Sequence, residues 1–192
     1  MTQDELNQAR TNPEFLTYLE KTRVDAIKTK NISALYEVLD SLLILDLEEE
    51  KVNDVYEHIL KIAFENVDNI VNTGKKLRLE GDELYYVRSF YEHAIEKWSC
   101  DDIEGAKELL FVLSNIIDDG LLQRALNVHL IACSKNYNLE QFYENMVNPE
   151  PSELEEKYGY FIVSFQEETE KILKDNTVVL KTLQHNLQHL LD

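Results

Sequence analysis

Two histidines near the end of the chain have a spacing found in metal sites. His185 and His189 are four residues apart, so on a helix both imidazoles lie on one side. Two imidazoles are fewer than the protein ligands of a zinc site, and no cysteine pair or His-Glu-x-x-His motif accompanies them. We therefore interpret them as polar residues beside the leucine-rich face of an amphipathic helix, and we expect neither a metal nor a cofactor.

A third histidine, His58, could carry phosphoryl-transfer chemistry. Residues 58–61, with the sequence HILK, resemble the His-x-Leu-Lys segment of histidine phosphotransfer domains, which are helical bundles with an exposed histidine. The resemblance implies that His58 would carry the phosphoryl group. Those domains usually have glycine after the lysine, where this chain has Ile62. A helical signalling protein centred on His58 is therefore one alternative function.

Motifs of other enzyme classes are missing from the sequence. It contains no Gly-x-Ser-x-Gly nucleophile motif, no phosphate-binding loop of the GxxxxGK type and no GxGxxG. It also lacks the Glu-x-x-His pairs that di-iron helical bundles place on inward faces. We expect a protein that is not an enzyme.

Aromatic residues indicate a different activity, the binding of a partner. Tyr85, Tyr86 and Tyr91 fall in one short stretch, and a tyrosine ring combines contact area with a hydrogen-bonding tip. The same rings could instead fill the core of a helical protein, with the hydroxyl groups at its surface. The predicted partner-binding residues are Tyr56, Tyr86, Phe90, Tyr91 and His93.

Residues 81–117 show which elements must position these side chains. Apolar residues from Leu84 to Trp98 recur every three or four positions, which is typical of one face of a helix. Asp102 is a good N-cap for a second amphipathic helix. Because the turn between the two is short, the helices should be antiparallel neighbours.

Helix-start signals recur at a nearly fixed interval along the chain. Asn31, Asn66, Asp102 and Asn138 are 35, 36 and 36 residues apart, and an aliphatic residue follows each of them. This period is typical of helical-hairpin repeats. An ordinary bundle whose helices have similar lengths is the alternative.

The unit with the clearest pattern resembles a tetratricopeptide (TPR) hairpin. The residues that carry the resemblance are Phe90, Ala94, Asp102, Ile103, Ala106 and Leu110. It covers residues 83–118 best and 14–147 more loosely. The resemblance implies a stack of antiparallel hairpins with a grooved surface that holds a peptide or a partner protein.

The sequence as a whole predicts an all-α protein of about eight helices, arranged as a TPR-like right-handed stack or an irregular bundle. Within residues 1–147 we expect a polar lead over 1–11 and helices over 13–29, 32–45, 51–64, 66–79, 83–98, 102–118, 121–134 and 138–147. Two prolines make residues 148–152 a linker. Residues 153–192 should form a helical pair on the same domain, either capping the stack or folding back into a groove. Ser152 and Glu155 form a capping-box pattern that predicts a first helix running to about residue 174, and Asn176 caps a second over 177–191.

The strong negative charge narrows the class of partner. With 37 acidic and 19 basic side chains, the net charge is −18, which disfavours nucleic acid and anionic membranes. We therefore expect an adaptor or small chaperone that binds a basic or amphipathic protein or peptide. The two cysteines lie in no motif, and the N-terminus is polar, so we expect a cytoplasmic protein. Self-assembly, as a homodimer or a larger structure, through the leucine-rich C-terminal helix is a further alternative.

Overall fold

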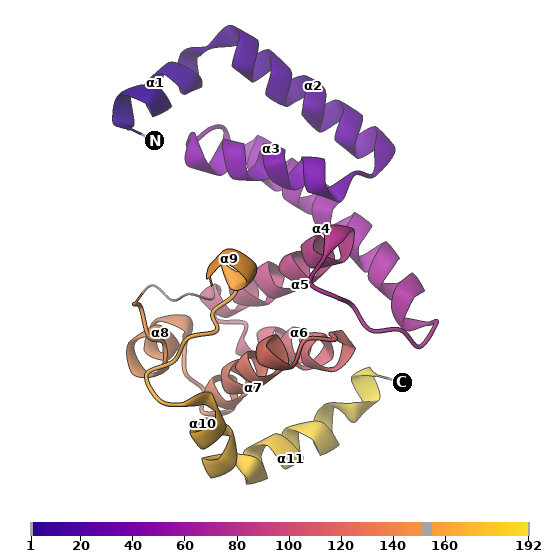
Figure 1. The fold of residues 1–192 in the computed structure, drawn as a ribbon, viewed down its shortest axis with the longest axis vertical. Coiled ribbons are helices and arrows are strands. Elements are labelled where there is room, and N and C mark those ends of the chain that lie inside the picture. Colours follow the sequence, from indigo (N-terminus) through magenta and orange to yellow (C-terminus); the bar gives the residue numbers. More distant parts are fainter. Residues whose placement is uncertain (1, 151–154, 192) are drawn as a thin grey trace. The chain divides into compact units, whose positions relative to one another are not determined.

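The computed structural model describes residues 2–150 and 155–191, and over this range the protein is all-α (Figure 1). Helices account for 77% of the structure, and no strand occurs in the part of the chain described. The predicted fold class is therefore confirmed, with more helices than the eight expected. The chain divides into two compact units, Met1–Asn69 and Ile70–Asp192, which are described separately.

Unit 1 is built from four helices joined by tight turns. They are α1 (Gln3–Thr11), α2 (Pro13–Thr29), α3 (Ile32–Ile44) and α4 (Glu49–Val71), the last of which runs just past the unit boundary. Lys30 ends α2 in the left-handed conformation, with a φ of 53°, and Asn31 caps α3 at once. Such a short turn makes α2 and α3 antiparallel neighbours that pack on each other.

Unit 2 begins with a series of packed helices around a fully buried apolar core. Its first helices are α5 (Gly81–Ser99), α6 (Ile103–Ile116), α7 (Gly120–Ser134) and α8 (Leu139–Met146). Helix α6 packs against both α5 and α7. Side chains with no more than 1% exposure include Trp98, Leu110, Phe111, Leu113, Leu122, Leu126 and Phe142.

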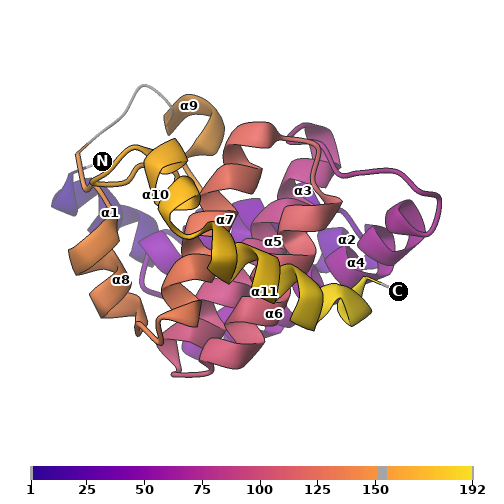
Figure 2. The same cartoon turned by 90° about the horizontal axis from the view of Figure 1, so that it is seen from below.

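The rest of unit 2 contains three short helices and one turn of 3-10 helix. These are α9 (Glu155–Tyr158), α10 (Thr169–Asp175), α11 (Thr177–Leu187) and η1 (Gln188–Leu190). Both α10 and α11 pack on α7 (Figure 2). No helix in the described ranges has the combined length and apolarity needed to cross a membrane.

Six of the predicted helices match helices of the structure, and several of their predicted caps make the expected hydrogen bonds. The ranges 13–29, 32–45, 83–98, 102–118, 121–134 and 138–147 correspond to α2, α3, α5, α6, α7 and α8. Asn12, Asn31, Asp102 and Asn138 each accept a hydrogen bond from a first-turn N–H of the helix that follows. The prediction of a polar lead over residues 1–11 is wrong, because α1 lies there, a helix with a capping box between Thr2 and Glu5.

The predicted break at Asn66 is wrong. Residues 51–64 and 66 onward belong to one helix, α4, and the side-chain amide of Asn66 donates to the carbonyl of Ile62 at 2.8 Å. The buried stripe of Ile62, Ala63 and Val67 continues through this position, so the helix has no reason to stop. The predicted helix over 66–79 is also wrong after Val71, because residues 72–79 are not helical and Leu77 instead pairs with Ile117. One of the four regularly spaced start signals is therefore not a helix start.

The long helix predicted after the proline linker is also wrong. After α9 the chain has no helix from 159 to 168, and the predicted cap at Ser152 lies outside the described residues. Residues 160–165 read YFIVSF, a composition that favours extended structure, and Phe165 pairs with Val147. The predicted division into residues 1–147, 148–152 and 153–192 stays a prediction.

Candidate functional site

A hollow between α2, α3 and α4 is the strongest candidate site of unit 1. It encloses about 360 Å³. Its apolar lining consists of Leu16, Leu19, Val38, Leu42 and Leu47, and its charged lining of Glu20, Arg23, Glu48 and Lys51. Apolar walls with a few charged groups are typical of sites that take an apolar side chain or a small ligand.

Two tight turns position the walls of this hollow between α2, α3 and α4, which is called the groove from here on. The turn at Lys30 brings α3 back along α2, so that Leu16 and Leu19 of α2 and Val38 and Leu42 of α3 line the same hollow. Asp46, with a φ of 49°, then turns the chain from α3 into α4. Leu47 and Glu48, which follow this second turn, also line the hollow.

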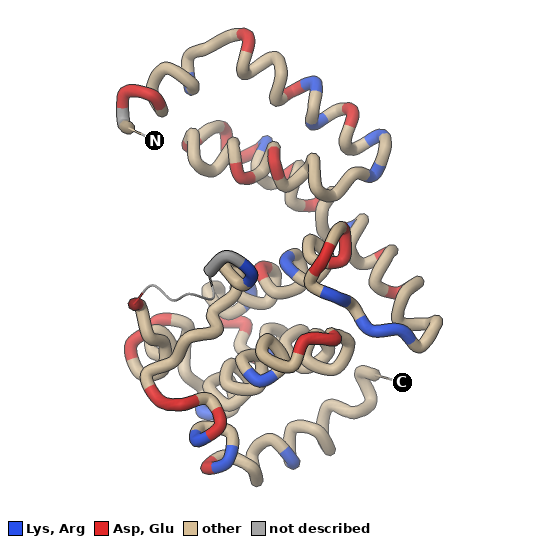
Figure 3. Tube along the Cα trace, viewed as in Figure 1, with Lys and Arg blue, Asp and Glu red and all other residues tan. Residues whose placement is uncertain are grey.

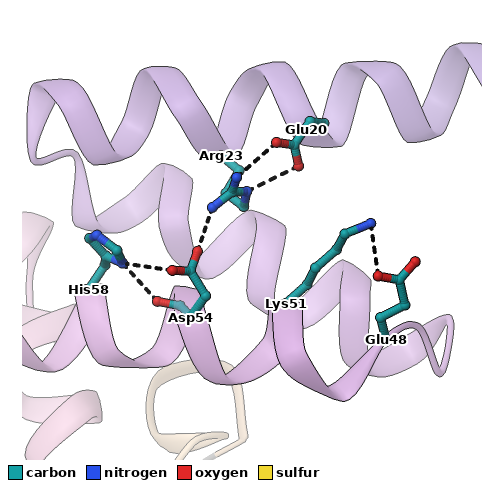
Figure 4. Close-up of polar contacts among 6 residues, drawn as sticks. All are labelled: Glu20, Arg23, Glu48, Lys51, Asp54 and His58. Carbon is teal, nitrogen blue, oxygen red and sulfur yellow. Dashed lines mark hydrogen bonds and ion pairs between the residues drawn. The ribbon is translucent and has the colours of Figure 1, made fainter.

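The charged groups on the groove wall form ion pairs, shown in Figure 4. The guanidinium of Arg23 contacts Glu20 at 2.8 Å and also contacts Asp54, while Lys51 lies 3.3 Å from Glu48. The hydrogen bond from Arg23 lowers the pKa of Glu20, and the same bond raises the pKa of Arg23. Among the residues that line the hollow, two carboxylates are matched by two cations, and Asp54, which does not line it, adds a third carboxylate beside Arg23.

The apolar surface continues over the outer side of α2. A second hollow is lined by Leu16, Thr17, Glu20, Lys21, Val24 and Asp25, so Leu16 and Glu20 contribute to both. The side chain of Val24 is 50% exposed there. A ligand lying over α2 could therefore contact both hollows.

His58 lies near the groove but does not line it. Its Nδ1 is 2.8 Å from the carbonyl oxygen of Asp54, which fixes the proton on Nδ1 and leaves Nε2 as the nucleophilic nitrogen (Figure 4). The same contact to a nearby backbone carbonyl recurs at His129 and His189. The geometry therefore does not single out His58, and the phosphotransfer function stays a prediction.

The predicted partner-binding residues are not brought together within one unit. Tyr56 lies on α4 in unit 1, whereas Tyr86, Phe90, Tyr91 and His93 lie on α5 in unit 2. The Nδ1 of His93 is 2.9 Å from a carboxylate oxygen of Glu96. Tyr86 and Phe90 are 8% and 4% exposed. Whether these residues bind a partner stays a prediction.

Tyr91 has a different environment from the one predicted. It is 3% exposed, and its ring meets Phe161 edge to face at 5.3 Å. Its hydroxyl group accepts from the N–H of Ile162 and donates to Nε2 of His129, both at 3.0 Å. Burial raises the pKa of Tyr91, so the hydroxyl keeps its proton. Tyr91 therefore holds together the core of unit 2.

His129 is the polar core residue to which sequence reasoning assigned no role. It is fully buried, and this burial lowers its pKa to about 4, although the hydrogen bond to Ala125 favours the charged form. Its ring lies among Trp98, Phe142 and Phe165. The only signal in the sequence was its place one repeat period after His93.

The two C-terminal histidines are exposed, His185 on α11 and His189 in η1. Among the described residues, no three His, Cys, Asp or Glu side chains are grouped so that they could hold a metal ion.

Comparisons of the sequence with family models and curated proteins, and of the fold with solved structures, give no match.

Proposed function

We propose that this chain is a non-catalytic protein-interaction module, an adaptor or small chaperone. Unit 1 binds an amphipathic, basic helix of a partner in the groove between α2, α3 and α4. The observation that carries the proposal is the hollow of about 360 Å³ lined by five apolar side chains and four charged ones. Helix-in-groove recognition uses an apolar trough of this kind, which takes the apolar face of the partner helix.

The charge distribution supports a basic partner. Arg23 is compensated by Glu20 and Asp54, and the exposed carboxylate of Glu48 lies at the rim beside Lys51. Figure 3 shows acidic residues along helices of both units, consistent with the net charge of −18. Complementary charge speeds encounter with a cationic partner and disfavours an acidic one.

We also propose that the hairpins are TPR-like. In the α5–α6 hairpin, Ala94 and Ala106 are both fully buried, at the positions where TPR-like packing calls for small residues. The free thiols of Cys100 and Cys133 support a reducing compartment such as the cytoplasm.

The groove can be tested with a fluorescent amphipathic peptide of leucine and lysine, about 18 residues long, which spans about 27 Å as a helix. The variant Leu16→Glu/Leu47→Glu places two charges on partly exposed positions of the groove lining. We expect it to weaken binding at least ten-fold in fluorescence anisotropy, because the peptide would bury apolar groups against carboxylates.

A matched control makes the same kind of change outside the groove. Leu43 and Ile44 are 55% and 60% exposed on α3, and neither lines the hollow. The variant Leu43→Glu/Ile44→Glu should bind the peptide within about two-fold of the unchanged protein, since solvent-exposed substitutions perturb little. Equal loss in both variants, or loss in neither, would exclude the groove as the binding site.

A further inference from the structure

Residues 157–168, here called the return segment, run from the last two residues of α9 to the start of α10 and lie against the core of unit 2 (Figures 1 and 2). Most of the segment is not helical. It is nevertheless held at three separate places, by side-chain hydrogen bonds at its start and by main-chain hydrogen bonds further along.

The first contact is at the N-terminus of α7. Asp119 caps that helix and also accepts hydrogen bonds from Lys157 Nζ at 2.7 Å and from the hydroxyl group of Tyr158. Burial alone would raise the pKa of Asp119, but the N–H of Leu122 together with Lys157 and Tyr158 lowers it. Asp119 is therefore an ionised acceptor for the beginning of the return segment.

The second contact is in the middle of the segment. The backbone N–H of Ile162 donates to the hydroxyl oxygen of Tyr91, which in turn donates to His129. The ring of Phe161 lies edge to face on Tyr91 and is 7% exposed. A side chain on α5 thus satisfies a main-chain donor next to an aromatic anchor.

The third contact is a short antiparallel pairing with the chain after α8. The N–H of Asn148 donates to the carbonyl of Ser164 at 3.1 Å, and the N–H of Gln166 donates to the carbonyl of Met146 at 2.9 Å. Between these bonds, Phe165 pairs with Val147, and its ring lies 6.0 Å from that of His129. This is the pattern of strand addition, in which main-chain bonds give affinity and side-chain pockets give specificity.

We propose that α5, α7 and α8 form a second, peptide-binding site, and that the return segment is its intramolecular ligand. The site also accepts an extended segment of another protein that carries two aromatic residues four positions apart, as Phe161 and Phe165 are. This inference concerns unit 2 alone and does not depend on the groove of unit 1, so either proposal can fail without the other.

Competition sets the affinity expected for such a partner. A tethered ligand acts at an effective concentration that can reach millimolar values, so an external peptide with the same contacts binds the unchanged protein weakly. Weakening the tethered ligand should therefore strengthen the binding of an external one. A segment that is only part of the core would give the opposite result, a protein that loses stability and gains no binding.

The experiment uses the full chain and a fluorescent peptide with the sequence of residues 157–168, KYGYFIVSFQEE. The variant Phe161→Ala/Phe165→Ala removes both anchors of the tethered segment. We expect it to bind the peptide at least ten-fold more tightly than the unchanged protein in fluorescence anisotropy. A peptide with both phenylalanines replaced by alanine should not show saturable binding.

The matched variant is Val163→Ala, which changes the same segment at a less buried position. It should bind the peptide as the unchanged protein does. The proposal is overturned if the folded anchor variant, checked by circular dichroism, gains no affinity, or if it binds both peptides equally.

A milder variant keeps the test decisive if the anchor variant does not fold. Lys157→Ala/Gln166→Ala removes the contact of Lys157 with Asp119 and those of the Gln166 side chain with the carbonyls of Glu144 and Val147. It leaves the aromatic core in place. We expect a gain in peptide affinity of about three-fold or more, and the absence of any gain would contradict the proposal.

Discussion

The buried pair of Tyr91 and His129 shows how single residues organise unit 2. Nδ1 of His129 donates to the carbonyl of Ala125, so Nε2 must be the nitrogen that accepts from Tyr91. The hydroxyl of Tyr91 then remains free to accept from Ile162. Every polar atom of this chain of hydrogen bonds has a partner only while His129 is neutral.

This arrangement predicts a specific dependence of stability on pH. The folded-state pKa of His129 is about 4, below the ordinary value of 6.5. The unfolded state therefore binds a proton at His129 more readily than the folded state does. The stability that the neutral histidine contributes is thus fully present above pH 6.5 and is lost as the pH falls toward 4. The loss from this residue should be about 3 kcal/mol of unfolding free energy.

Urea unfolding at pH 7 and pH 4.5 can isolate this effect. Because the carboxylates titrate in both proteins, the difference between the unchanged chain and His129→Gln reports the histidine alone. We expect the variant to be less stable at pH 7 and to lose less stability on acidification. An identical pH dependence of the two proteins would show that His129 is not held neutral.

At the scale of elements, side-chain caps were the reliable signals in the sequence. Asn31, Asp102 and Asn138 each start a helix, because a short polar side chain before an apolar stripe satisfies first-turn N–H groups. The same residue type does not start a helix at Asn66. There an apolar stripe continues on both sides, and the side-chain amide donates a hydrogen bond to the carbonyl of Ile62 in the same helix. Residue type alone does not distinguish these two situations.

Alanine substitutions at the two kinds of asparagine should have opposite effects. Asn138→Ala removes a capping box and should lower the free energy of unfolding by about 1 kcal/mol. Asn66→Ala lies inside α4 and should be neutral or stabilise by up to about 0.5 kcal/mol, since alanine is the better helix former. Chemical denaturation measures both, and a loss of about 1 kcal/mol at Asn66 would indicate a helix start there after all.

The return segment illustrates why other elements could not be predicted. The composition of its run of aromatic and β-branched residues favours extended structure, but periodicity alone does not distinguish a short apolar run in an extended stretch from one in a buried helix. Its pairing partner, Val147, is distant in the sequence and lies beside the prolines read as a linker. Nothing local indicates that these two stretches meet, because the contact depends on tertiary packing.

For the molecule as a whole, the sequence predicted the class of fold better than the place of the site. The apolar stripes of residues 13–29 and 32–45 could be recognised by their spacing, but a stripe does not reveal where two helices leave a hollow between them. The tyrosines of α5 were predicted to bind a partner because of their residue type. Tyr91, the most conspicuous of them, supports the core of unit 2.

The central claim is that unit 1 binds a basic amphipathic helix between α2, α3 and α4. The most direct test is an NMR titration of the ¹⁵N-labelled chain with the leucine–lysine peptide, recorded at low and at high salt. The claim predicts saturable shifts of the amides around Leu16, Val38 and Leu47, with weaker binding at high salt because the charge attraction is screened. Shifts concentrated on residues 86–93 of α5, or binding that salt does not weaken, would contradict it.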